Sequence, residues 1–286
     1  TCSQLVARCG GDGVNPYYND GRCSYCGADD PTCEERCVLR CEVKQIDCIE
    51  HMKGMDAESV DLICTSPPYK AEKSYESWAS FEDYEDFADQ WVEQAARVLT
   101  PTGTMMLNVG YTKIARNETL PLTYLYHRLA YKHGLKLVQE IVWRYYGGMA
   151  YKLRYTHRTE RIMWLTKDPD NCTFNLDNVR VKEWKAFDKR NNPLGKNPSD
   201  VWEIKRVVGG TGAVEMKYNH PAQFPKALVE RIIKAHSNEG DLVFDPFLGT
   251  GTTCIVAEEL GRNSLGCELL DEYLEVCEVR GVEVTA

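Results

Sequence analysis

The sequence contains no apolar run of about 20 residues, the length that a membrane-spanning helix needs. It also contains no low-complexity tract and no internal repeat, which argues against a repeat architecture. No secretory signal is recognisable at its start. Its 286 residues, of which 43% are hydrophobic, are enough to bury a sizeable core. We therefore expect one large domain with a small appendage and no membrane partner.

A glycine-rich loop at residues 245–253 lacks the lysine of a phosphate-binding loop. Thr252 stands directly after its last glycine, where a triphosphate-binding loop carries Lys. The flanking sequence predicts a turn and buried strand at 240–245 and a helix at 252–260, and open α/β sheets bind ligands at such a strand end. Glu268 follows about 20 residues on, as a ribose-binding acid does in dinucleotide folds. The loop is predicted to hold a nucleoside cofactor, with a dehydrogenase as the alternative interpretation.

A second segment, Thr-Ser-Pro-Pro-Tyr at residues 65–69, follows the apolar run 59–64. Because proline cannot donate to a sheet ladder, the chain must leave the sheet at Ser66. The two prolines restrict the backbone, so the Ser66 hydroxyl and the carbonyls of Ser66 and Pro67 form a set of acceptors suited to an exocyclic amine. Tyr69 is predicted to stack on the base that carries this amine. A plain strand-to-loop turn is the alternative interpretation.

Three motifs in one order carry a resemblance to a known family. They are the segments 66–69, 220–225 and 245–253. In this order they resemble the permuted "beta" group of S-adenosylmethionine-dependent DNA amino-methyltransferases, over roughly residues 42–278. The resemblance implies an α/β, Rossmann-like class I methyltransferase fold with a mixed seven-stranded sheet and flanking helices, circularly permuted so that the catalytic element precedes the cofactor loop. It also implies S-adenosylmethionine as cofactor, double-stranded DNA as partner and an intracellular location with the DNA.

The resemblance further assigns roles to single residues. The catalytic element would comprise Ser66, Pro67, Pro68 and Tyr69. The cofactor site would take Asp47 and Cys48 for the adenine ring, Glu268 for the ribose hydroxyls, His220, Phe224 and Pro225 over the methionine end, and Thr65, Asp245, Pro246, Phe247, Gly249, Gly251, Thr252 and Thr253 from the two motif segments. Within a methyltransferase domain at 42–286, residues 42–110 would carry catalysis, about 111–217 would face DNA and 218–286 would bind the cofactor.

The net charge of −9 is unevenly divided along the chain. Residues 113–217 hold 20 Lys+Arg against 11 Asp+Glu, whereas the other residues hold 14 against 32. A basic region of this kind attracts DNA phosphates. Within it, residues 145–155 mix aromatics, glycines and cations as a base-contacting loop does, and 189–198 resembles the Gly-Lys-Asn-Pro stretch of the family. We predict that this region faces DNA; a solvated basic face is the alternative.

Eight of the 13 cysteines lie at or before Cys48. The spacing of Cys23, Cys26, Cys33, Cys37 and Cys41 has the close pairs of tetrahedral zinc sites, although it matches no standard zinc motif. We predict a structural zinc in a cysteine-rich segment at residues 1–41. Disulfides, which require an oxidising compartment, and reduced thiols on one helix face are the alternatives.

The predicted reaction is direct methyl transfer to an exocyclic amine without a covalent enzyme intermediate. The amine of a paired base is buried in the duplex, so the base must first be flipped out, at a cost of a few kcal/mol. Serine at position 66 resembles the N4-cytosine enzymes of the family, which favours cytosine and leaves adenine N6 open. A non-catalytic DNA-binding module is the alternative from another class. An RNA or protein-glutamine methyltransferase is disfavoured because such enzymes have the cofactor loop first.

Hydrophobic periodicity predicts the other elements. We expect helices at residues 81–99, 120–131, 226–236 and 271–277, of which residues 100–103 end the first, and strands at 43–46, 59–64, 104–108, 137–144, 161–166 and 264–267.

Overall fold

The computed structural model describes residues 18–19, 22–23, 41–70, 78–147, 152, 155–182, 192–209, 213 and 215–285. The chain divides into two compact units, Thr1–Arg40 and Cys41–Ala286. In the first unit, β1 (Tyr18–Asn19) and β2 (Arg22–Cys23) form an antiparallel pair. The roles predicted for residues 1–41 and 42–286 stay predictions.

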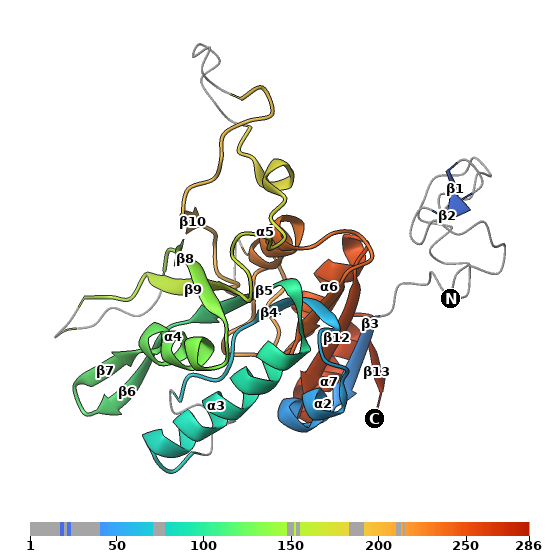
Figure 1. Cartoon of the computed structure of the whole chain (residues 1–286). Coiled ribbons are helices and arrows are strands. Elements are labelled where there is room, and N and C mark those ends of the chain that lie inside the picture. Colours follow the sequence, from blue (N-terminus) through green and yellow to red (C-terminus); the bar gives the residue numbers. More distant parts are fainter. Residues whose placement is uncertain are drawn as a thin grey trace. The chain divides into compact units, whose positions relative to one another are not determined.

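The second unit consists of a large sheet with helices on both faces (Figure 1). Its main-sheet strands are β3 (Cys41–Gln45), β4 (Val60–Thr65), β5 (Leu99–Val109), β8 (Lys136–Arg144), β9 (Thr159–Thr166), β10 (Val201–Glu203), β11 (Leu242–Asp245), β12 (Asn263–Glu268) and β13 (Glu283–Thr285). Its helices are α2 (Cys48–Gly54), α3 (Phe81–Val98), α4 (Leu122–Lys132), η2 (Leu176–Val179, a 3₁₀ turn), α5 (Lys226–His236), α6 (Thr252–Glu259) and α7 (Asp271–Val279), and β6 (Tyr111–Ala115) pairs with β7 (Glu118–Pro121) in a separate hairpin.

The main sheet runs in the order β10-β8-β9-β5-β4-β11-β12-β3-β13. Only β9 runs antiparallel to its neighbours in this sheet, so the predicted mixed α/β fold is confirmed. The predicted number of strands is wrong, because the described sheet has nine strands rather than seven. The additional strands are β10 and β13, which are three residues long and lie at the two edges. Three residues are too few to show a period-2 pattern.

The predicted helix at 226–236 coincides with α5, and the other predicted helices and strands differ from the structure by a few residues at their ends. Residues 100–103 follow the end of α3, as predicted, but they belong to β5, which begins at Leu99 rather than at residue 104. The pairing of β4 with β5 changes register there, between Val60 and Leu62, and this irregularity accommodates the Pro-Thr-Gly sequence inside the strand.

Helix α3 shows why the local sequence folds as it does. Ser80 accepts a hydrogen bond from the backbone N–H of Asp83, and the Asp83 carboxylate accepts one from the N–H of Ser80, so the helix starts with a capping box. Apolar residues then recur at helical spacing, and the buried side includes Tyr84, Trp91 and Val98. The capping box therefore sets where the helix begins, and the apolar spacing sets which side packs against the sheet.

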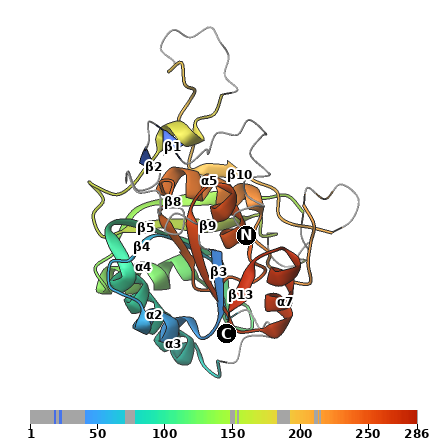
Figure 2. The same ribbon diagram turned by 90° about the vertical axis from the view of Figure 1, so that its right-hand side faces the viewer.

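Two helical layers bury the two faces of the sheet, as the view in Figure 2 shows for α2, α3 and α4 on one side and α5 and α7 on the other. On β4, Ile63 packs into the cluster with α2, α3 and α4, whereas Leu62 and Cys64 pack with α5 and α6. Because both faces are covered, β4 has the continuous apolar run Leu62–Cys64 instead of an alternating pattern. In the described part of the chain no helix has the length and apolar character of a membrane span.

The parallel strands β4, β11 and β12 are neighbours, so their carboxyl ends lie at one edge of the sheet. Thr65, Asp245 and Glu268 are the last residues of these strands. Two segments about 180 residues apart in the chain are thereby adjacent at the place where open α/β sheets bind ligands.

Trp91 connects α3 to this edge, and its removal tests the packing. Its ring is fully buried and lies edge-on to Phe247, with centroids 5.3 Å apart. We expect Trp91→Ala to lower the free energy of unfolding by roughly 3–5 kcal/mol, because it leaves a cavity. Urea denaturation measures the change, and Gln90→Ala, on the exposed side of the same helix, is the control. Equal stabilities of the two variants would contradict this packing.

Candidate active site

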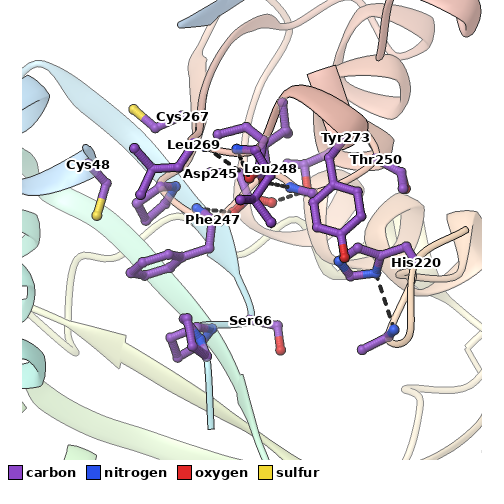
Figure 3. Close-up of a pocket in the computed structure, with 18 of the residues that line it drawn as sticks. Cys48, Ser66, His220, Asp245, Phe247, Leu248, Thr250, Cys267, Leu269 and Tyr273 are labelled. Atoms are coloured by element: carbon purple, nitrogen blue, oxygen red, sulfur yellow. Dashed lines mark hydrogen bonds between the residues drawn. The ribbon is translucent and has the colours of Figure 1, made fainter. Parts of the chain in front are cut away.

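A pocket of about 390 Å³ lies at the carboxyl ends of β4, β11 and β12. Figure 3 shows Ser66 on one side of it, Asp245 and Phe247 across from it, and His220 and Tyr273 beside them. The residues lining it are Ile46, Asp47, Cys48, Ser66, Pro67, Pro68, Tyr69, Trp78, Phe87, His220, Ala222, Gln223, Phe224, Asp245, Pro246, Phe247, Leu248, Gly249, Thr250, Thr252, Thr253, Cys267, Glu268, Leu269, Leu270 and Tyr273. The structure thus brings the two motif segments into one cavity.

Most of the residues predicted for the site line this pocket, and three do not. Thr65 is fully buried behind it, Pro225 is the N-cap of α5, and Gly251 is the N-cap of α6. These three residues shape the site without facing the cavity. The chemical roles predicted for the lining residues stay predictions.

The carboxylate of Asp245 joins the two segments. Its Oδ1 accepts a 2.6 Å hydrogen bond from the Thr65 hydroxyl, and its Oδ2 accepts a 2.6 Å bond from the Thr253 hydroxyl. The backbone N–H of Phe247 donates to Oδ1 as well, at 3.1 Å. Burial raises the pKa of this carboxyl to about 6, and the two threonine hydroxyls oppose that rise. Asp245 therefore holds the strand end before Ser66 against the glycine loop.

Two positions of the glycine loop require glycine, because the backbone angle is left-handed and because a neighbouring side chain lies close to where a Cβ would be. Gly249 has φ 58°, and a Cβ there would lie 3.2 Å from Nε2 of His220. Gly251 has φ 81°, and a Cβ there would lie 3.1 Å from the sulfur of Cys277. Side chains rarely adopt such left-handed backbone angles, so the loop can turn tightly into α6 only with glycine at these positions.

Glu268 binds backbone donors with both carboxylate oxygens. Its Oε2 accepts from the N–H of Gly249 at 2.8 Å, and its Oε1 accepts from the N–H groups of Leu269 and Leu270 at 2.9 and 3.0 Å. Burial raises the pKa of this carboxyl, while the three N–H donors lower it. A carboxylate has about four acceptor sites, so Glu268 keeps capacity for a hydroxyl of a ligand in the pocket.

Asp47 lines the pocket after the end of β3, the strand that pairs with β12, and it caps α2. Its Oδ1 accepts from the N–H groups of Ile49 and Glu50 at 2.9 and 3.2 Å. The carboxylate thus replaces two of the hydrogen bonds that the first turn of a helix lacks. The sequence analysis did not predict helix α2, although Asp47 followed by an acidic first turn is a capping signal.

The proline segment is held rigidly from behind. The hydroxyl of Tyr84 on α3 donates to the carbonyl of Pro68 at 2.8 Å, and the Ser66 and Tyr69 hydroxyls lie 2.9 Å apart. Tyr69 is further bound by Asn108, whose Nδ2 donates to its hydroxyl at 2.9 Å. The acceptors of this segment are therefore placed before any ligand arrives.

Several site residues were not predicted. Asn108 on β5 and Glu160 on β9 adjoin the Ser66–Tyr69 hydroxyls, and a polar residue near the end of an apolar strand is the signal that would have indicated Asn108. Trp78, Phe87 and Tyr273 line the pocket. Phe87 lies in the helix predicted at 81–99, and hydrophobic periodicity does not distinguish a core aromatic from one at a pocket wall.

The predicted zinc site falls mainly outside the described residues. Cys26, Cys33 and Cys37 lie there, as does the side chain of Cys23. Cys41 begins β3. A hydrogen bond between its thiol and that of Cys254 on α6 lowers the pKa of Cys41. Among the residues that the structure describes, no group of three or more potential ligands is placed to hold a metal. The zinc site stays a prediction without structural support.

The buried Asp245 carboxyl predicts a pH dependence of stability. The ordinary pKa is 3.8 and that in the folded protein about 6, so between these values the folded state binds more protons than the unfolded state. The contribution of Asp245 to the free energy of unfolding must therefore decrease as the pH rises through this window. From pH 4 to 7, we expect the wild type to lose on the order of 2–3 kcal/mol relative to Asp245→Asn.

Urea denaturation of both proteins at the two pH values measures this difference. Asp86→Asn, which removes one exposed carboxylate on α3, controls for the change in net charge. A difference between wild type and Asp245→Asn that stays constant with pH would refute the raised pKa.

Comparisons with known proteins agree with this geometry. A family model for DNA methylases, N6_N4_Mtase, matches residues 60–279. The type II methyltransferase M.ScaI of Streptomyces caespitosus is 38% identical over 238 residues, which cover 80% of this chain and 77% of that protein. The DNA adenine methyltransferase YhdJ of Escherichia coli K12 is 34% identical over 244 residues, covering 80% of this chain and 79% of YhdJ.

A solved structure is similar over most of the chain as well. The protein TTHA0409 of Thermus thermophilus, solved in complex with S-adenosyl-L-methionine, matches with a TM-score of 0.59 and 25% identity over 86% of this chain and 99% of that one. The sequence comparisons and the structural comparison thus both match this chain to DNA methylases. The protein belongs to the N6_N4_Mtase family of DNA methylases.

Proposed function

We propose that the chain transfers a methyl group from S-adenosylmethionine to the exocyclic N4 amine of a cytosine flipped out of double-stranded DNA. One observation carries the proposal: Ser66 and the glycine loop line the same pocket, and the 2.6 Å bond between Thr65 and Asp245 fixes their separation. An amine acceptor and a cofactor loop that share one cavity are what a direct transfer requires.

The pocket fits a nucleoside cofactor with a charged sulfur. Its volume of about 390 Å³ is in the range of small-molecule sites. Glu268 retains acceptor capacity for ribose hydroxyls, as argued above, and Gly249 lets the backbone approach a ligand closely. Phe247 and Phe87 supply apolar wall. Asp245 and Glu268 also place negative charge around the cavity, which favours a cationic ligand. The relative solved with S-adenosyl-L-methionine supports the same assignment.

The cofactor supplies an activated methyl group, and the protein must present the amine to it. The lone pair of an exocyclic amine is delocalised into the base, so the amine is a poor nucleophile. Hydrogen bonds from its two protons to the Ser66 hydroxyl and the Pro67 carbonyl favour a pyramidal nitrogen with its lone pair directed at the methyl group. Because Tyr84 fixes the neighbouring Pro68 carbonyl, these acceptors need little reorganisation during the reaction.

Tyr69 suits the role of a stacking platform. Its ring lines the pocket while its hydroxyl is bound behind it, and a Cβ on Gly110 would lie only 3.1 Å from its ring. Hydroxyl anchorage and contact with Gly110 leave the ring little freedom. A flipped base stacked on it gains roughly 1–3 kcal/mol, comparable to the cost of flipping.

The described part of the basic region supports contact with DNA. At the end of β8, the Arg144 guanidinium lies over the exposed ring of Tyr146, 5.3 Å from the ring centroid. Further along the connection, Tyr155 is 98% exposed. These residues lie in or next to the connection from β8 to β9. At the two ends of this connection, the Tyr145 hydroxyl and the Glu160 carboxylate contact each other beside the catalytic segment. The central parts of the two predicted DNA loops, 148–151, 153–154 and 183–191, lie outside the described residues.

Adenine N6 is the second candidate target. Serine at position 66 resembles the N4-cytosine enzymes and is the reason for proposing cytosine. The 34% identity to the adenine enzyme YhdJ favours adenine instead. Both reactions use the same acceptors for an exocyclic amine, so the target base must be identified chemically.

A transfer assay identifies the reaction and the base together. The protein is incubated with labelled S-adenosylmethionine and unmethylated duplex DNA, and the DNA is digested to nucleosides. We expect the label in N4-methylcytosine. Label in N6-methyladenine would replace cytosine by adenine, and no transfer to DNA of varied sequence would refute the proposed function.

Ser66→Ala tests the amine acceptor. The variant should bind S-adenosylmethionine with unchanged affinity but lose transfer by a factor of roughly 100 or more, since one preorganised acceptor is removed. Calorimetry gives the affinity and the transfer assay gives the rate. Ser59→Ala, before the amino end of the same strand, is the control and should keep full activity. Turnover by Ser66→Ala at the wild-type rate would exclude Ser66 as the acceptor.

A further inference from the structure

A carboxylate without an assigned role lies directly behind the catalytic segment. Glu160, the second residue of β9, has its Oε2 2.7 Å from Nδ2 of Asn108 and 3.2 Å from the Tyr69 hydroxyl. Its Oε1 lies 3.4 Å from the Tyr145 hydroxyl. Glu160 does not line the pocket, so it reaches a ligand only through Tyr69 and Ser66.

The chemistry of these groups sets the direction of their hydrogen bonds. A carboxylate only accepts and an amide NH₂ only donates, so Asn108 donates both to Glu160 and to the Tyr69 oxygen. Three acceptors lie within reach of the Tyr69 proton: the Ser66 oxygen at 2.9 Å, the backbone carbonyl of Asn108 at 3.1 Å and the charged Glu160 at 3.2 Å. The charged acceptor forms the stronger bond. With Tyr69 donating to Glu160, the Ser66 hydroxyl is free to donate to Tyr69, 2.9 Å away.

This direction matters for the substrate. If the Ser66 proton points backward to Tyr69, the lone pairs of Ser66 face the pocket and can accept from an amine. If these hydrogen bonds ran in the opposite direction, Ser66 would donate its proton into the pocket and repel the N–H groups of the amine. The charge of Glu160 thus decides whether Ser66 is an acceptor or a donor.

We propose that Glu160 is a positioning residue for methyl transfer, which orients the hydroxyls of Tyr69 and Ser66 and receives through them the proton that leaves the amine. This inference rests on the proposed function, in which Ser66 accepts from the amine.

The proton balance of the step is simple. As the bond between the amine nitrogen and the methyl carbon forms, the bond from that carbon to the sulfur of the methyl donor breaks, and its electron pair stays on the sulfur. The positive charge passes to the amine nitrogen, which must then lose one proton. The N–H bond breaks as its proton passes to the Ser66 oxygen, the Ser66 proton passes to the Tyr69 oxygen, and the Tyr69 proton passes to Glu160. The result is a neutral methylated amine and a protonated Glu160, and both hydroxyls are restored.

The surroundings of Glu160 suit a proton acceptor. Burial and then the Glu160 charge raise the pKa of Tyr145 to about 12, so Tyr145 remains a protonated donor beside the carboxylate. Burial raises the pKa of Tyr69 as well, with the Glu160 charge as the second cause. Both phenols therefore stay protonated at neutral pH, and of the two only the Tyr69 hydroxyl lies between Ser66 and Glu160.

Glu160→Gln tests the inference in the transfer assay. The amide of Gln can donate to the Tyr69 oxygen, which reverses the direction of the hydrogen bonds between Tyr69 and Ser66. We expect kcat to fall by about 100-fold or more, the usual contribution of acid–base groups, whereas the KM for S-adenosylmethionine changes by less than about threefold. Tyr69→Phe, which keeps the ring but cuts the chain, should also lower kcat, and combining it with Glu160→Gln should cause little further loss. Glu160→Asp should recover part of the rate.

Glu140→Gln, which removes an exposed carboxylate on β8, is the matched control and should keep the wild-type kcat. A kcat of Glu160→Gln within about threefold of wild type, or losses that multiply in the double variant, would overturn the inference while leaving the proposed function intact. A parallel loss of kcat and cofactor affinity would overturn it too, because it would mark damage to the whole site. No transfer to DNA by the wild type would overturn both.

Discussion

The buried carboxylate of Asp245 is the contact on which the site depends. Burying an ionised carboxylate is unfavourable unless its oxygens are hydrogen-bonded, and here three donors bind it, two of them hydroxyls at 2.6 Å. One donor, Thr65, ends the strand before the Ser-Pro-Pro-Tyr segment, and another, Thr253, lies in the first turn of α6. A single side chain thereby fixes the distance between the two segments that line the pocket.

A second set of contacts holds the glycine loop from the other side. Arg280, after α7, donates to the hydroxyls of Thr250 and Thr252 at 3.1 and 3.0 Å, and its guanidinium lies 5.1 Å from the centroid of the Tyr218 ring. The backbone N–H of Tyr218 in turn donates to Gln223, in the segment that borders the pocket. The loop is thus held by both Asp245 and Arg280, and Glu268 binds the backbone N–H of Gly249 between them.

The sequence allowed the prediction of those parts of the fold and site that depend on local chemistry. Helix α5 has a clear periodic pattern, and the Pro-Pro segment and glycine loop have restricted backbones, so each was recognisable alone. Their adjacency followed only from the family resemblance, because periodicity does not tell which strands are neighbours. Glu160 was missed for the same reason: it reaches Tyr69 and Asn108 only through the pairing of β5 with β9, which no local pattern indicates. The edge strands β10 and β13 were missed because their three residues carry no pattern.

The three carboxylates around the catalytic segment differ in the acceptor capacity that their partners leave. Asp245 is bound by two hydroxyls and one N–H and is buried, so it acts as a structural contact. Glu268 is bound by three backbone N–H groups at the pocket wall and keeps room for one more donor. Glu160 binds one amide and two phenol hydroxyls, and a phenol hydroxyl can pass on a proton as a backbone N–H cannot. The donor type therefore separates a carboxylate that holds the fold, one that can hold a ligand and one that can accept a proton, although all three side chains carry the same functional group.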